Sequence, residues 1–232
     1  MFLENKILAT SVACLLALSV GCASNKGGES GAESAPAVAE APAAPQPQEP
    51  AQMKATLGQV APNFTLQDVE GKSVSLADFR GKTVVLEWFN PGCPFVKYAH
   101  GEGGPLEMRP STWVEKGVTW IAINSGGKGK EGADMGQNQK ASMSWGMSYP
   151  VLMDGSGRVG KMYGAKSTPH MFVINGDGVL VYQGALDNAP LGNLSGDVAV
   201  NYVDEALEAL TAGEAVAQAN TKPYGCSVKY AN

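Results

Sequence analysis

Residues 87–100 read EWFNPGCPFVKYAH, and a change of pattern within this stretch decides the fold. The apolar and β-branched run from Thr83 to Phe89 is typical of a buried central strand. A helix is expected to follow, with Cys93 at the junction and Pro94 at the first helical position, where proline loses only an unpartnered N–H. A cysteine at a helix N-terminus faces free N–H groups and the positive end of the helix dipole, which favour the thiolate. Cys93 is therefore the candidate reactive residue, with a small buried structural cysteine as the alternative.

On both sides of this stretch, strand patterns alternate with helix patterns. Residues 62–76 alternate apolar and polar around Glu70-Gly71-Lys72, which is the signature of a β-hairpin. The later elements predicted are an interrupted helix with breaks at Gly101 to Pro105 and at Pro110, a strand at 118–124, a helix at 133–147, a strand at 149–154, a short helix at 157–164, a hairpin at 171–183 and an amphipathic helix at 197–210. The order predicts an α/β fold of three layers, with a mixed central sheet, helices on both faces and an N-terminal hairpin.

A glycine-rich segment follows the strand at 118–124. Residues 125–132 read SGGKGKEG, which superficially resembles a phosphate-binding loop. The Gly-Lys-[Ser/Thr] ending of that motif is absent, because Glu131 follows Lys130. We therefore expect a mobile, solvated loop, and no cofactor is expected anywhere in the chain.

The first 21 residues have the pattern of a secretion signal. Lys6 precedes an apolar run at 7–20, which contains Cys14 and is short for a membrane span. The run ends in LSVGC at 18–22, which resembles a bacterial lipobox and implies lipidation of Cys22. Ala23 follows where an inner-membrane retention signal would have Asp, so an outer-membrane anchor facing the periplasm is expected. An ordinary signal peptide that holds a cysteine is the alternative.

Composition divides the rest of the chain into three parts. Residues 22–57 are rich in Ala, Pro and Glu without an aromatic residue, and are expected to form a disordered tether. The folded domain is expected at 58–212, and 213–232 form a C-terminal tail that carries Cys226. The formal net charge of −5 argues against a nucleic-acid partner.

Two motifs together resemble a known family. The strand-to-cysteine turn at Cys93 and the stretch STPHMFVI at 167–174 look like a thioredoxin fold. Residues 58–212 resemble the alkyl hydroperoxide reductase/thiol-specific antioxidant (AhpC/TSA) redoxins, and within them a peroxiredoxin-like branch with Cys-Pro-Phe-Val. The resemblance implies that Thr168-Pro169 is a cis peptide lying against Cys93, with backbone groups that an extended substrate could pair with.

The chain also departs from these relatives. Thioredoxin uses Cys-x-x-Cys, whereas Asn90 to Cys93 keeps only the second cysteine of that pattern. Peroxiredoxins carry Pro-x-x-x-Thr/Ser-x-x-Cys and an arginine near the penultimate strand, but the loop before Cys93 is too short and Pro169 takes the place of the arginine. These differences argue against both a one-turn disulfide and an efficient peroxidase.

A second thiol lies in the tail. Once the signal is removed and Cys22 is lipidated, Cys93 and Cys226 are the remaining free cysteines, and an even pair in an oxidising compartment suggests a disulfide. We expect Cys93 to be the nucleophile and Cys226 the resolving cysteine, with a static structural disulfide as the alternative.

The leading functional hypothesis is an envelope thiol-disulfide oxidoreductase. Its partners would be a protein or small-molecule thiol or disulfide and an electron donor that the sequence does not identify. Three alternatives remain open: a thiol-dependent peroxidase that uses the same cysteines, a copper-delivery protein similar to Sco-type thioredoxin folds, with Cys93 and His170 as ligands and Cys226 as an optional third, and a non-catalytic envelope module. His100 and His170 are both candidates for a chemical role near Cys93, although such histidines are more often packing residues.

Overall fold

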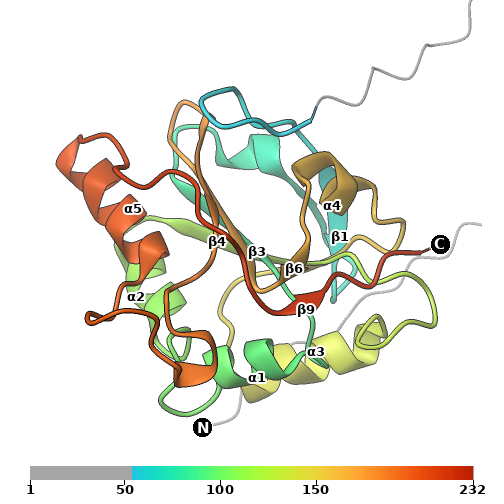
Figure 1. Cartoon of the computed structure of the whole chain (residues 1–232). Coiled ribbons are helices and arrows are strands. Elements are labelled where there is room, and N and C mark those ends of the chain that lie inside the picture. Colours follow the sequence, from blue (N-terminus) through green and yellow to red (C-terminus); the bar gives the residue numbers. More distant parts are fainter. Residues whose placement is uncertain (1–53, 232) are drawn as a thin grey trace, which may run out of the picture. The chain divides into compact units, whose positions relative to one another are not determined.

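A seven-stranded mixed sheet lies at the centre of the computed structural model, which describes residues 54–231 (Figure 1). Its strands, in spatial order, are β2 (Ser73–Ser75), β1 (Thr65–Asp68), β5 (Val151–Met153), β4 (Thr119–Asn124), β3 (Val84–Trp88), β7 (His170–Ile174) and β8 (Leu180–Gly184). The pairs β3–β4 and β4–β5 are parallel, and the other pairs are antiparallel. The predicted N-terminal hairpin is β1–β2, and the predicted closing hairpin is β7–β8.

Helices cover both faces of this sheet, as the sequence predicts. One face carries α1 (Pro94–His100), α2 (Arg109–Glu115), α3 (Met135–Ser144) and α5 (Tyr202–Ala212). The other face carries α4 (Arg158–Tyr163) and a 3₁₀ turn, η1 (Leu76–Phe79), while a second turn, η2 (Pro190–Gly192), lies beside α1. The result is the three-layer α/β arrangement of a thioredoxin-like fold (Figure 1).

Strand β3 is apolar except for Glu87, because both of its faces are covered. Val85 and the following Phe89 pack into the core on the side of α1, whereas Leu86 and Trp88 pack on the side of α4. All five residues of β3 are buried. A strand buried on two faces needs a continuous apolar run rather than alternation, and this run delivers Cys93 to a fixed position at the carboxyl end of the sheet.

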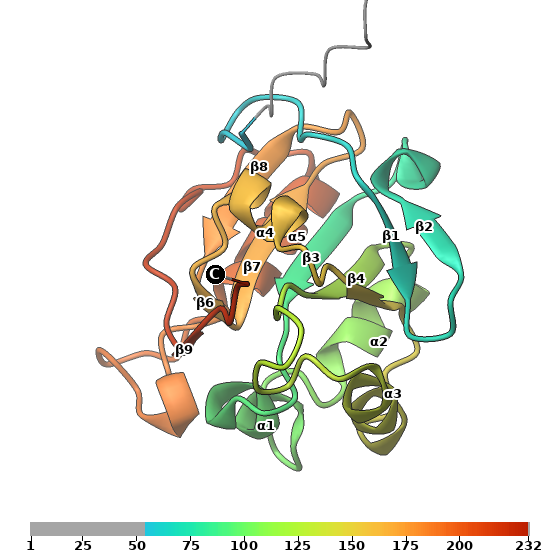
Figure 2. The same cartoon turned by 90° about the vertical axis from the view of Figure 1, so that its right-hand side faces the viewer.

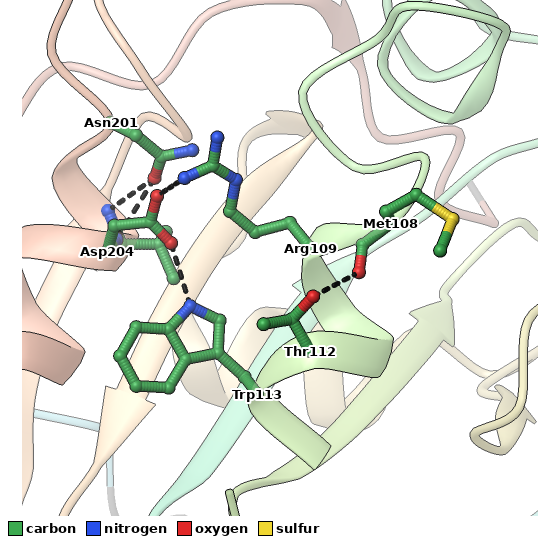
Figure 3. Close-up of polar contacts among 7 residues, drawn as sticks. Met108, Arg109, Thr112, Trp113, Asn201 and Asp204 are labelled. Atoms are coloured by element: carbon green, nitrogen blue, oxygen red, sulfur yellow. Dashed lines mark hydrogen bonds and ion pairs between the residues drawn. The ribbon is translucent and has the colours of Figure 1, made fainter. Parts of the chain in front are cut away.

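Polar contacts join α2 to α5 on the first face (Figure 3). Asp204 of α5 accepts a hydrogen bond from Trp113 Nε1 at 2.8 Å and forms an ion pair with Arg109. Asn201 caps α5, because its side-chain oxygen accepts from the backbone N–H groups of Val203 and Asp204. The contacts of Asp204 thus hold α5 against α2.

Three local expectations need correction. Helix α5 begins at Tyr202 rather than at 197, and Val198 is 70% exposed, because Asn201 provides the cap that starts the helix. Pro110 does not interrupt a helix but lies in the first turn of α2, where proline is tolerated. The glycine-rich loop is not fully solvated, since Gly127 is buried and donates its N–H to the carbonyl of Lys229 in the tail at 2.7 Å.

The predicted signal peptide, the lipidation site Cys22 and nearly all of the predicted tether lie outside the described residues. Between Lys54 and Ala231, no helix is long and apolar enough to span a bilayer.

Candidate active site

Cys93 lies at the end of the central strand and at the start of α1. It is the N-cap residue of this helix, and Pro94 follows in the first turn, as the sequence predicts. The Cys93 N–H donates to the carbonyl of Asn90 at 3.0 Å, which closes the turn between strand and helix. The Cys93 side chain is nearly covered, because the residue is only 3% exposed.

Thr168 and Pro169 lie against Cys93, as the resemblance implies. The Thr168-Pro169 peptide is cis, and it separates the two-residue strand β6 (Ser167–Thr168) from β7. The Cys93 thiol donates to the carbonyl oxygen of Thr168 at a sulfur–oxygen distance of 3.0 Å. The hydroxyl of Thr168 is buried and has no hydrogen-bond partner, and the Thr168 side chain lowers the pKa of Cys93.

The C-terminal tail brings Cys226 to the same place. Its strand β9 (Cys226–Ser227) pairs antiparallel with β6, with Cys226 opposite Thr168 (Figure 2). Cys226 packs against the core cluster that contains Cys93, each cysteine shifts the pKa of the other, and both thiols are free. The two cysteines that the sequence analysis singled out are therefore adjacent, although they come from opposite ends of the folded region.

The two sulfurs have opposite acidities. Burial by itself would raise the pKa of Cys93, but hydrogen bonds from the Cys226 side chain, the Thr168 hydroxyl and the Val96 backbone outweigh it, so the pKa is lowered from 9.0. Burial and the neighbouring Cys93 raise the pKa of Cys226 to about 11. Cys93 is therefore the more acidic thiol of the pair and the one more readily converted to a thiolate.

The tail is fastened on both sides of Cys226. Before it, the Tyr224 hydroxyl donates to Asp187 at 2.6 Å, and the ring of Tyr224 lies 5.9 Å from that of Phe95 in α1. After it, the Tyr230 hydroxyl donates to the Ala165 carbonyl at 2.8 Å. Glycines line the path of the tail, and a Cβ on Gly127 would lie 2.6 Å from the backbone of Ala231.

Neither His100 nor His170 forms a hydrogen bond or an ion pair with Cys93. His170 accepts a hydrogen bond from the Lys166 N–H at its Nδ1 atom, and burial lowers its pKa to about 4, so it is neutral at physiological pH. His100 pairs with the buried Glu87 at 2.7 Å and stacks on Trp145. Within the described part of the chain, no three His, Cys, Asp or Glu side chains are grouped so that they could hold a metal ion. The arrangement therefore gives the copper alternative no ligand set beyond the two thiols.

Sequence reasoning missed two residues that shape this site. Asn90, which we considered only as a missing cysteine, accepts from the Gly92 N–H at 2.7 Å and donates to the Glu131 carbonyl at 3.0 Å. It thereby ties the turn before Cys93 to the glycine-rich loop. Glu87 lies in the middle of an apolar strand, and this unusual position was the signal for its buried pair with His100.

Comparisons with known proteins show the family and the fold of the chain. The family model described as AhpC/TSA matches residues 57–183. Thiol-disulfide oxidoreductase ResA of Bacillus thuringiensis subsp. konkukian is 30% identical over 130 residues, which cover 56% of this chain and 70% of that protein.

Two solved structures have a similar fold. The hypothetical protein SMc02350 from Sinorhizobium meliloti 1021 is 28% identical with a TM-score of 0.67, covering 77% of this chain and 96% of its own. An uncharacterized conserved protein from Geobacillus kaustophilus is 30% identical with a TM-score of 0.67, covering 76% and 93%. The fold, the position of Cys93 at a helix start and the match over residues 57–183 together show that this chain belongs to the AhpC/TSA family.

Proposed function

We propose that this protein is a thiol-disulfide oxidoreductase whose redox-active pair is Cys93 and Cys226. The observation that carries the proposal is the contact between the two thiols across the β6–β9 ladder, where one pKa is lowered and the other is raised. A low-pKa thiolate beside a second thiol is the arrangement that thiol-disulfide exchange requires. The similarity to thiol-disulfide oxidoreductase ResA supports the same reaction class.

The reaction moves two electrons between the pair and a substrate. When Cys93 and Cys226 join in a disulfide, the two electrons reduce a substrate disulfide to two thiols, and the reverse reaction oxidises a substrate dithiol. Each direction passes through a mixed disulfide between the substrate and one of the two cysteines. The sequence assigns the attack on the substrate to Cys93 and the resolving step to Cys226, and this order requires the tail to lift away from Cys93.

The pair should exist in two stable oxidation states. Mass spectrometry of the mature protein under non-reducing conditions should show a Cys93–Cys226 crosslink after mild oxidation, and dithiothreitol should remove it. A titration against glutathione or dithiothreitol redox buffers then gives the potential. A bridge that resists potentials below about −300 mV is a static structural disulfide and contradicts the proposal.

A hydroperoxide reductase with the same two thiols is the second candidate, favoured by membership of the AhpC/TSA family. The side chains that lower the pKa of Cys93 are Cys226 and Thr168, and neither carries a positive charge that could polarise a peroxide. We therefore expect stopped-flow oxidation of the reduced protein by hydrogen peroxide to be no faster than oxidation of free cysteine thiolate. A much faster, saturating reaction would identify a peroxidase.

We also propose that the protein is a lipoprotein of the cell envelope. The motif at residues 18–22 and the apolar run before it support lipidation of Cys22. Replacement of Cys22 by serine should abolish incorporation of labelled palmitate and release the protein from the membrane fraction. Labelling that persists in this variant would exclude the proposed anchor.

A further inference from the structure

The docked tail leaves the two sulfurs of the pair unequally accessible. Cys93 lies beneath the tail and is 3% exposed, whereas Cys226 is only partly buried. Cys226 lies on β9, which pairs with β6 in a sheet of two strands within the described region. Thr168 of β6 is also the residue whose carbonyl contacts Cys93. With the tail docked, Cys226 therefore remains partly accessible to a molecule from solvent, whereas Cys93 is almost inaccessible.

Hydrogen bonds along the tail oppose that displacement. The backbone of Thr221 pairs with Gln183, its hydroxyl accepts from the Ala185 N–H at 2.8 Å, and the Val228 N–H donates to the Lys166 carbonyl at 3.1 Å. The hydrogen bond of Tyr224 lies between Thr221 and Val228 along the tail, and that of Tyr230 follows Val228. Lifting Cys226 off Cys93 breaks several of these interactions together, because they follow one another along a short segment.

Disulfide exchange depends on both access and the leaving group. The attacking thiolate approaches one sulfur in line with the S–S bond and expels the other sulfur, and a leaving thiol of lower pKa departs faster. Attack on Cys226 expels Cys93, whose thiolate the Thr168 hydroxyl and the Val96 N–H stabilise. Attack on Cys93 would expel Cys226, whose pKa is about 11, and would first require the tail to move. Both criteria favour the same sulfur.

We infer that, in the disulfide form of this protein, a substrate thiolate attacks the sulfur of the partly exposed Cys226 and releases Cys93 as a thiolate, while the tail remains docked. This inference rests on the proposed function. It exchanges the roles of the two cysteines, because Cys226 rather than Cys93 forms the bond to the substrate. The bond between Cys93 and Cys226 breaks, its electron pair stays on Cys93, and a new bond joins Cys226 to the substrate sulfur. A second thiolate of the substrate then attacks its own bound sulfur, closes the substrate disulfide and releases Cys226, which takes up a proton.

The substrate class implied is a dithiol, and the two electrons flow from it to the Cys93–Cys226 pair. Stabilisation of the Cys93 thiolate favours the reduced form of the pair, so the disulfide form is an electron acceptor for such a substrate. The same geometry makes Cys226 the residue that carries any mixed disulfide.

The test uses the oxidised full-length protein and 2-mercaptoethanol, a monothiol that cannot complete the second step. After a brief exposure the reaction is quenched with acid, free thiols are alkylated, and the adduct is located by peptide mass spectrometry. We expect the mercaptoethanol adduct on Cys226 and the alkyl label on Cys93, in a ratio of at least about ten to one. An adduct found mainly on Cys93 overturns the inference and leaves the proposed function intact. If oxidation of the protein does not form the Cys93–Cys226 bridge, both the inference and the proposed function are overturned.

Two variants test the inference without the internal disulfide. Cys93→Ser and Cys226→Ser each retain one thiol of the pair, which is loaded with thionitrobenzoate as a coloured leaving group. Release of colour by 2-mercaptoethanol should be at least about tenfold faster from Cys226 in the first variant than from Cys93 in the second. Equal rates would show that the tail does not shield Cys93 and would contradict the inference. Circular dichroism of both variants checks that the fold is retained.

Discussion

Thr168 lies directly opposite Cys226 in the β6–β9 ladder, while its own carbonyl oxygen accepts the hydrogen bond of the Cys93 thiol at 3.0 Å. One residue thus positions both cysteines of the pair. A change at Thr168 should therefore alter the pKa of Cys93, whereas a change in the neighbouring tail should alter how fast a reagent reaches Cys93.

Thr168→Val should raise the pKa of Cys93. Valine keeps the β-branched shape but lacks the hydroxyl that donates to the thiolate. A hydrogen bond to an ionised group contributes about 1.5–3 kcal/mol, so the thiolate of the variant should be measurably less stable. Absorbance of the thiolate at 240 nm, followed against pH, should show the first titration step moving toward higher pH. Thr211→Val, in which the lost hydroxyl contacts only the carbonyl of Leu207, serves as the control; an unchanged first step in Thr168→Val would exclude the role of the hydroxyl.

Gly225→Ala should undock the tail. Gly225 has φ of +114°, and a Cβ there would collide with the backbone carbonyl of Thr168. Strain of this kind costs about 1–3 kcal/mol in the docked state, so iodoacetamide should modify Cys93 on the order of tenfold faster. The matched control is Gly213→Ala, where φ is +74° but no atom lies within 4 Å of the added Cβ. Equal modification rates in the two variants would indicate that the tail does not cover Cys93.

His170 should make the folded state less stable in mild acid. Burial lowers its pKa in the folded protein to about 4 from an ordinary value of 6.5, so protons bind the unfolded chain more strongly. The stability due to neutral His170 is complete above about pH 6.5 and is lost as the pH falls toward 4, by about 3 kcal/mol at most. Urea unfolding of the wild type and of His170→Asn, which keeps an acceptor for the Lys166 N–H, should give a constant difference in free energy between pH 7.5 and pH 6.5, and this difference should change as the pH falls from 6.5 toward 4, because only the wild type loses stability there. Parallel profiles would show that His170 titrates normally.

Asp204→Asn should weaken the contact between α2 and α5 without affecting the cysteines. Asparagine can still accept from Trp113, but its NH₂ group then faces the Arg109 guanidinium (Figure 3). Because the Arg109 side chain is half exposed while Asp204 is buried, loss of this contact should lower the free energy of unfolding by about 1 kcal/mol. Denaturant unfolding measures this loss, and Glu205→Gln, an exposed change in the same helical turn, is the control. A loss of equal size in both variants would locate the effect in the helix dipole instead.

Local patterns in the sequence were sufficient for most of the fold. The apolar run at 83–89 predicted a strand buried on both faces, and Cys93 followed by Pro94 predicted a helix start, because both depend on residues adjacent along the chain. The beginning of α5 was misplaced, since the apolar Val198 extended the pattern and only the cap at Asn201 shows where the helix starts.

The sequence also singled out Cys93, at a predicted helix start, and Cys226, because these two cysteines remain if the predicted signal is removed and Cys22 is lipidated. It could not determine which of the two cysteines is the more exposed, because exposure depends on how the tail packs against distant segments. The tail pairs with β6 at Thr168, and Ala231 packs against Gly127, where a side chain would collide with it. The pair between Glu87 and His100 likewise depends on helix α1 packing against β3. The sequence by itself therefore determined the strand, the helix start and the identity of the two thiols, whereas their contact, acidity and unequal access were decided by side chains that meet only when distant segments pack together.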